Sequence, residues 1–311
     1  RHTRSLCDWS SDVCSSDLPE YEDIADKFLN DFILLAFATS SPRMGNMPLW
    51  DEEDGFYYDV LRRPDGSSSY LKTRSVAGIT PLFAVESFDA ETTMRFPLLR
   101  RRYEWFKTNR PQLLQHLQHL GSQVDGRTLV SLVPPERLRR ICERLLAEDE
   151  FLSPHGIRAL SRVYRDPPYT FTEGNQTETL AYSPADSPVA MFGGNSNWRG
   201  PVWMPVNFLL VEALRKLHAY YGDDFLVECP TGSGTRTTLD GIADFLSRRL
   251  VSLFLPGEDG RRPCDGASSE PHVAGDEDLL VFHEYFHRSE EHTSELQSHS
   301  DLVCRLLLEK K

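Results

Sequence analysis

Apolar side chains recur at steps of three and four residues over several long segments, and this helical period is the feature that most constrains the fold. The first such segment begins at Pro19 and carries an apolar series that fits one helix face: Tyr21, Ile24, Ala25, Phe28, Phe32, Leu35 and Ala36. It ends near Ser40 and Pro42, because the residue before a proline is pushed out of helical geometry. The segment is therefore predicted to be one helix followed by a loop.

Further helices are expected at about 80–88, 91–108, 110–120 and 134–148. Two stronger ones follow Pro201, which suits a first helical turn, and Thr238, whose side chain can cap the next helix. Strand patterns are short, near 56–60, 70–73 and 129–133, and fit hairpin-like loops. Helices joined by long aromatic and Gly-rich loops predict an all-α fold, either a helical solenoid or a closed barrel with its function on loops at one end.

Composition and charge exclude several classes of function. A formal net charge of −13 at pH 7 repels polyanions, so nucleic acid is not an expected partner. The longest apolar stretch, 32–38, is far too short to span a membrane. Six cysteines without a CxxC pair indicate neither a zinc site nor a disulfide framework. We therefore expect no cofactor, no metal and no membrane partner, and the oligomeric state stays open.

The two ends differ from the middle. Residues 1–18 (RHTRSLCDWSSDVCSSDL) and 288–311 (RSEEHTSELQSHSDLVCRLLLEKK) resemble translated sequencing-adapter or cloning read-through, so both are set aside from the fold. The authentic segment is then 19–287. Any signal peptide would have been lost with the true N-terminus, and a cytoplasmic location is an expectation only.

The loop 49–59 combines aromatic and acidic side chains in a way that suits sugar binding. Trp50 and Tyr57 offer ring faces for the apolar side of a pyranose, while Asp51 and Asp54 can accept hydrogen bonds from its hydroxyls. The alternative is an acidic turn that ends in an ordinary hairpin. A calcium loop is disfavoured, because the spacing D-x-[DN]-x-[DN]-G is not met.

A second loop, 192–207, leads into a helix. Its glycines permit close backbone approach, Asn195 offers donors and acceptors, and Trp198 offers a stacking face beside Arg199. Trp203 follows at the start of the helix. A binding loop is the favoured interpretation, and a structural turn with buried tryptophans is the alternative.

The third segment, 281–287, places Glu284 among aromatic residues and between two histidines, where an apolar wall can raise a carboxyl pKa for acid-base work. His283, Glu284 and His287 also spell HExxH, so a zinc hydrolase is a second interpretation. The motif lies at the end of the authentic sequence, with no room for a third ligand downstream. A purely structural aromatic segment is the third interpretation.

Five ordered stretches together resemble glycoside hydrolase family 63, in particular bacterial glucosidase-like members related to mannosyl-oligosaccharide glucosidase. They are LWDEEDGFYYDV, LKTRSVAGITPLFAV, FLSPHGIRALS, GGNSNWRGPVWMPVN and YYGDDFLVECPTGSG. The resemblance spans nearly all of 19–287. It implies an (α/α)6 barrel, incomplete here, with short β-hairpins and a sugar site in a funnel of loops.

The resemblance also implies an inverting hydrolase with two carboxyl groups about 6.5 to 9.5 Å apart. It makes Glu284 the general base and places the general acid, an Asp, in a G-L-D-N-like segment upstream of Pro19. Asp51 and Asp54 remain weaker candidates for that acid. The chain is thus expected to be an inactive fragment of an enzyme for α-glucosides or related oligosaccharides. A non-catalytic carbohydrate-binding or scaffold protein and the zinc hydrolase are the alternatives.

Overall fold

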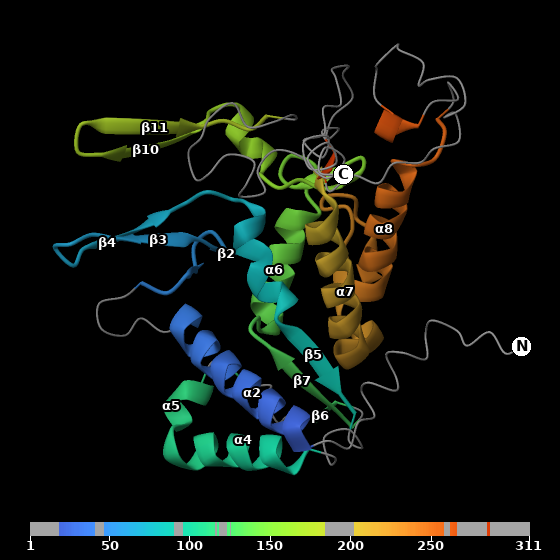
Figure 1. Cartoon of the computed structure of the whole chain (residues 1–311). Helices are drawn as coiled ribbons and strands as arrows, with labels where there is room; N and C mark the ends of the chain where they lie inside the picture. The colour runs from blue at the N-terminus through green and yellow to red at the C-terminus, as the bar shows by residue number, and fades with distance from the viewer. Residues whose placement is uncertain are drawn as a thin grey trace, which may run out of the picture.

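A computed structural model describes residues 19–40, 47–89, 96–115, 117, 123–124, 126–183, 202–257, 262–265 and 285–286. Six α-helices lie in these ranges: α2 (Pro19–Ser40), α4 (Pro97–Asn109), α5 (Pro111–Leu114), α6 (Pro135–Leu145), α7 (Met204–Tyr221) and α8 (Leu239–Ser252). Shorter 3-10 turns are η2 (Val76–Phe83), η3 (Arg162–Arg165), η5 (Gly222–Asp224) and η6 (Pro263–Asp265). In Figure 1, α7 and α8 stand side by side, while α2 lies across α4 and α5.

The strands of the described residues form seven small antiparallel sheets. The three-stranded sheet β5-β7-β6 is built from Val85–Phe88, Arg127–Ser131 and Gln123–Val124. Two hairpins project together from one side of the molecule in Figure 1: β3–β4 (Asp59–Arg62, Ser68–Leu71) and β10–β11 (Tyr169–Glu173, Gln176–Leu180). The remaining pairs are β1–β2 (Trp50–Asp51, Phe56–Tyr57), β8–β9 (Leu152–Ser153, Gly156–Ile157), β13–β14 (Leu226–Glu228, Arg236–Thr238) and β12–β15 (Val202–Trp203, Tyr285–Phe286).

The expected all-α, incomplete (α/α)6 barrel is wrong for the part of the chain that the structure describes. That part is mixed, with 47% of its residues helical and 24% in strands. Residues 80–88 illustrate the reason, because η2 ends at Phe83 and β5 then pairs with β7 from Val85↔Ser131 to Phe88↔Thr128. A short apolar run fits either period, and the strand partner decides between them.

Most of the expected helices are present with shifted ends. The helix from Pro19 is confirmed as α2, and Thr238 caps α8, its hydroxyl accepting a hydrogen bond from Gly241 N at 3.1 Å. The helix expected after Pro201 begins instead at Met204, with Pro205 in its first turn. No helix among the described residues combines the length and apolarity that a membrane span needs.

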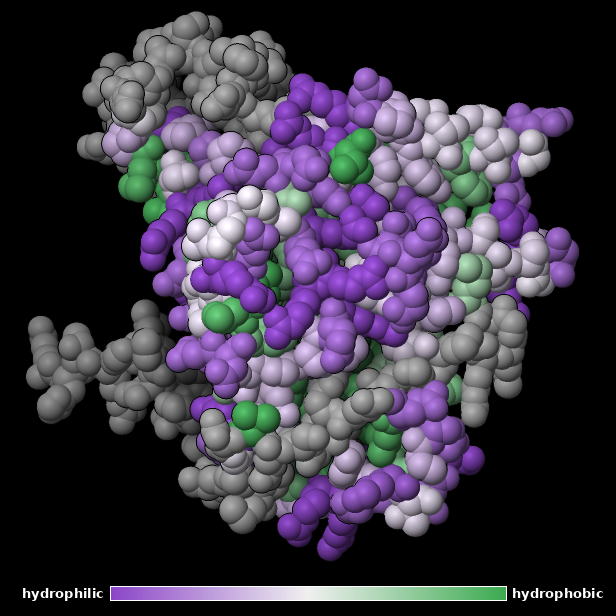
Figure 2. Space-filling view, turned by 180° about the vertical axis from the view of Figure 1, so that it is seen from behind, coloured by the Kyte–Doolittle hydropathy of each residue, from purple (hydrophilic) through white to green (hydrophobic). Residues whose placement is uncertain are grey.

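One main apolar core joins α2, α6, α7, α8 and the β5–β7 strands. Two small clusters lie apart from it, and one of them, Leu253, Cys264 and Phe286, closes the region where β12 and β15 meet. The face seen in Figure 2 is covered mainly by hydrophilic residues, with separate hydrophobic patches.

Candidate functional site

The strand pair β12–β15 brings two of the three predicted site segments together. Val202 pairs with Phe286 and Trp203 with Tyr285, although the two strands lie far apart in sequence. The Trp203 and Tyr285 rings are tilted, with centroids 4.5 Å apart, and both residues are buried. Glu284 lies outside the described residues. Parts of the predicted segments 192–207 and 281–287 are therefore paired as neighbouring strands.

Asn207, on α7, forms hydrogen bonds with the β8–β9 turn. Its Oδ1 accepts a hydrogen bond from Ile157 N at 2.7 Å, and its Nδ2 donates to Ile157 O at 3.1 Å and to Trp203 O at 2.9 Å. The side chain is 1% exposed, and its oxygen and its nitrogen both have hydrogen-bond partners in the protein, as buried polar atoms require. Asn207 thus ties the start of α7 to strand β9.

Gly156 allows the β8–β9 turn to lie close to strand β12 and helix α8. Its φ is +127°, and a Cβ at this position would lie 2.8 Å from Leu250 Cδ2 and 3.2 Å from Val202 Cγ1. A side chain would therefore be strained in its backbone and would push the turn away from β12. Asn207 and Gly156 were not predicted as site residues. The only sequence signal for Gly156 was the turn Ser153-Pro-His-Gly156.

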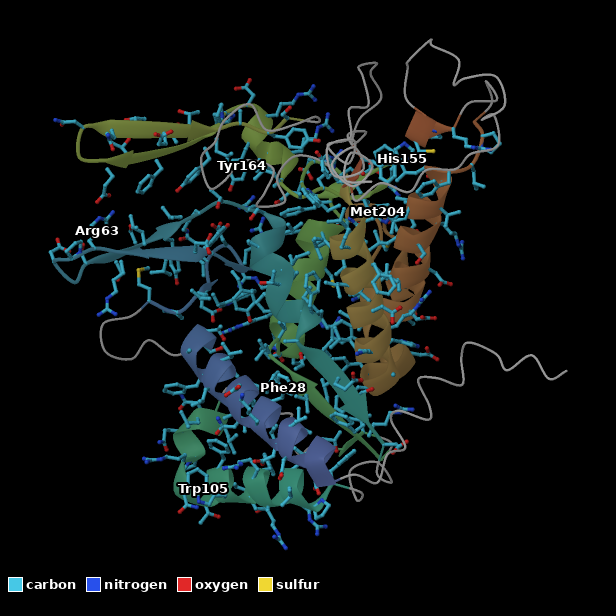
Figure 3. All side chains as sticks on the ribbon, in the orientation of Figure 1. Phe28, Arg63, Trp105, His155, Tyr164 and Met204 are labelled. Carbon is cyan, nitrogen blue, oxygen red and sulfur yellow. The ribbon has the colours of Figure 1, made fainter. Side chains whose placement is uncertain are left out.

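His155 lies at the same turn, next to Met204 in the view of Figure 3. Its Nδ1 is 3.1 Å from Ser252 Oγ, and the Ser252 hydroxyl donates its hydrogen to Arg249 O at 2.6 Å. Because a hydroxyl has one hydrogen, Nδ1 of His155 is the donor to Ser252. The contact anchors the turn to the end of α8.

The aromatic side chains of the loop 49–59 lie in the core, whereas Glu52, Glu53 and Asp59 of the same loop are exposed. Trp50 and Tyr57 are 2% and 3% exposed. Their rings meet edge to face at 4.9 Å, and the guanidinium of Arg137 lies 4.8 Å from the Trp50 ring centroid. No exposed ring face is left for a sugar, so in this arrangement Trp50 and Tyr57 act as packing residues.

Asp51 and Asp54 of this loop belong to a network of ion pairs with Lys72 and Arg74. Asp51 Oδ2 lies 2.9 Å from Lys72 Nζ, and Asp54 lies 3.3 Å from both Lys72 Nζ and Arg74 Nη2. Tyr58 also donates a hydrogen bond to Asp54 at 3.0 Å. Arg74 continues the network to Glu150 at 3.1 Å. The network joins the loop to the residues that follow strand β4 and to the segment after α6.

These partners determine the protonation of the two carboxyl groups. Burial acts to raise the pKa of Asp54, but the Tyr58 hydrogen bond and the charges of Arg74 and Lys72 outweigh it, so the pKa is lowered. For Asp51, burial is again outweighed, by backbone hydrogen bonding from Asp54 and by Lys72. A general acid must hold its proton near neutral pH. Neither Asp51 nor Asp54 is suited to that role here.

The geometry also bears on the HExxH interpretation. Tyr285 and Phe286, the two residues inside the motif, form an extended strand, whereas zinc ligands at i and i+4 need one helix face. Among the residues that the structure describes, no group of three or more His, Cys, Asp or Glu side chains is placed to hold a metal. The other predicted site residues lie outside the described residues: Asn195, Trp198, Arg199, His283, Glu284 and His287.

Comparison with known proteins gives a relative but no activity. No protein-family model matches the chain. A curated yeast protein, the uncharacterized protein YMR196W of Saccharomyces cerevisiae, is 38% identical over 284 residues, which cover 86% of this chain and 26% of the yeast protein. The chain is therefore similar to a part of that relative, and it spans about a quarter of the relative's length.

Proposed function

We propose that the region around β12 and β15 is one side of the active site of an inverting glycoside hydrolase acting on α-glucosides or related oligosaccharides. The observation that carries this proposal is the strand pair β12–β15, because it joins the segment 192–207 to the segment 281–287, which contains Glu284 in its sequence. These two segments were predicted independently to bind sugar and to supply a catalytic carboxyl. A cytoplasmic location is part of the proposal.

In this proposal Glu284 is the general base, and Asn195, Trp198 and Arg199 contact the sugar. Trp203 stabilises the site, since its ring packs on Tyr285. Trp50, Asp51, Asp54 and Tyr57 stabilise the fold and do not contact the sugar, because they are buried or held in ion pairs. The general acid is then none of these carboxyl groups, and it comes from outside residues 19–287.

A base without its acid leaves the chain inactive on glycosides whose leaving group needs a proton, but not on a substrate whose leaving group needs none. In α-glucosyl fluoride the leaving group departs as fluoride and needs no proton from an acid. Water attacks C1, its proton passes to the Glu284 carboxylate, the C–F bond breaks, and β-glucose and fluoride are released. Methyl α-glucoside, whose leaving group must be protonated, is expected to remain intact.

The experiment measures fluoride release by the purified 311-residue chain and the anomer of the first product by NMR. We expect inversion to β-glucose and a loss of about a hundredfold or more in the variant Glu284→Gln. Glu178→Gln, on the exposed hairpin strand β11, is the matched control and is expected to keep the wild-type rate. Binding of the sugar without fluoride release, or equal rates in both variants, would refute the proposal and favour a non-catalytic binding protein.

A further inference from the structure

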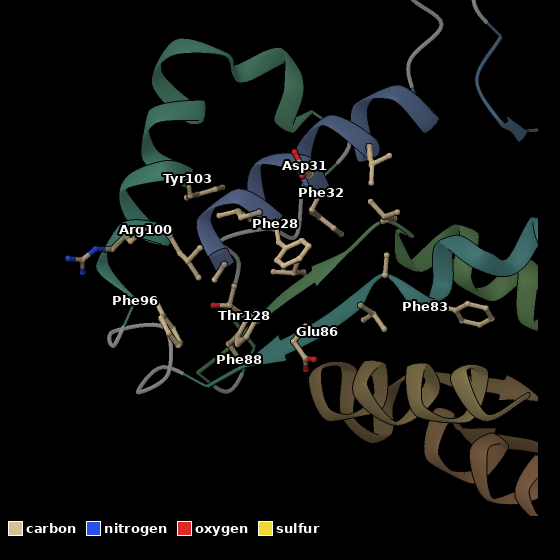
Figure 4. A pocket seen from close by; sticks show the side chains of 18 residues that line it. Phe28, Asp31, Phe32, Phe83, Glu86, Phe88, Phe96, Arg100, Tyr103 and Thr128 are labelled. Atoms are coloured by element: carbon tan, nitrogen blue, oxygen red, sulfur yellow. The ribbon is translucent and has the colours of Figure 1, made fainter. Parts of the chain in front are cut away.

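An open apolar groove lies between α2, α4 and the strands β5 and β7. Its volume is about 840 Å³. Phe28 and Phe32 project from α2 toward the strands in Figure 4, and Val130 and Leu132 line the groove from the other side. Its charged lining residues are Asp31, Glu86 and Arg100, and Glu86 is paired with Lys216 at 2.6 Å. The groove is thus a hydrophobic surface with few charges.

Helix α2 carries more apolar surface than its neighbours cover. At about 100° per residue, its apolar side chains from Ile24 round to Ile33 span about 180° of the helix, wider than the roughly 100° stripe of a helix with one buried face. Ile33 and Ala36 are 0% and 1% exposed and belong to the core. Phe28 and Leu35 are 66% and 56% exposed and line the groove. One half of the apolar face of α2 is therefore uncovered.

We propose that this groove holds an amphipathic helix from another part of the same, longer polypeptide. The yeast relative is matched over only 26% of its length, so about three quarters of a protein of that kind lies outside this segment and can supply the helix. An apolar groove lined by helices α2 and α4 and by strands β5 and β7 fits a further helix that inserts side chains at i, i+3, i+4 and i+7. The same packing gives α2 the second apolar neighbour that its sequence requires.

Two other occupants fit the groove less well. A second copy of the chain would present the same concave surface in an isologous contact, and two concave surfaces leave a void between them. A small apolar ligand would remain in contact with water, because Phe28 and Leu35 are more than half exposed, whereas binding pockets bury about 70 to 90% of a ligand.

Cysteine labelling tests the proposal. Phe28→Cys and Leu35→Cys are introduced into the 311-residue chain and into the intact polypeptide encoded by the source gene. Both positions lie on the tryptic peptide 28–43, which contains no native cysteine. Trp105→Cys on α4 is the control, since Trp105 is 48% exposed and does not line the groove (Figure 3). Maleimide labelling of each peptide is followed by mass spectrometry.

We expect both groove cysteines to react readily in the 311-residue chain. In the intact polypeptide they are expected to react on the order of a hundredfold more slowly, because the reagent then needs local opening of the docked helix. The control cysteine should react alike in both. Equal labelling of the groove in both proteins would overturn the proposal. Protection within the 311-residue chain would also overturn it, indicating a second copy if it grows with concentration, or a ligand if an apolar molecule is extracted.

Discussion

Replacing Asn207 by Ala should destabilise the protein more than the removal of so few side-chain atoms suggests. The side chain is buried and makes three hydrogen bonds, two of them to the N–H and C=O of Ile157 on β9. The substitution leaves both of these backbone groups without their partner in a buried location, because Ile157 is 1% exposed. An orphaned buried group costs about 1 to 3 kcal/mol, so for two groups we expect a loss of about 2 to 6 kcal/mol.

Urea unfolding followed by tryptophan fluorescence and by circular dichroism measures this loss. With a slope of about 3 kcal/mol per molar urea, the midpoint should fall by about 0.7 to 2 M. Asn109→Ala is the matched control, because Asn109 donates one exposed hydrogen bond to Trp105 O, and exposed substitutions change stability by about 0.5 kcal/mol or less. If Asn207→Ala and Asn109→Ala lower the midpoint equally, Asn207 does not hold the β8–β9 turn to α7 as described.

Two further predictions concern ionisable groups. The hydrogen bond and charge of Arg102 lower the pKa of Asp26, so the stabilisation by this pair is complete above about pH 4, the unfolded value, and is lost as the pH falls through the folded pKa. Urea midpoints from pH 6 to pH 2 should therefore fall more steeply for the wild type than for Arg102→Met, and parallel curves would contradict this. Burial raises the pKa of the Cys142 thiol to about 12 and that of Cys229 to about 11. Peptide mapping after iodoacetamide treatment at pH 8 should find both thiols unmodified in native protein and modified in 8 M urea, and fast native labelling would show that they are not buried.

The sequence predicted the site unevenly. Segments 192–207 and 281–287 were singled out by their unusual residues, and the structure joins β12 and β15 within them. Trp50 and Tyr57 were predicted to stack on a sugar ring, yet they are buried against Arg137. A residue's type does not reveal whether its ring faces solvent or core, because the partners that cover it lie elsewhere in the chain. Asn207 was missed for the same reason, since its role depends on Ile157, 50 positions away.

What the sequence determined by itself is local: the helix from Pro19 to Ser40 and the capped helix after Thr238. Period, capping residues and proline act within a few neighbours, so a linear pattern carries them. Only the tertiary structure decided that 85–88 is a strand, that Trp203 meets Tyr285, and that half of the apolar face of α2 is uncovered. Strand pairing and burial depend on distant partners, whose identity the local pattern does not contain.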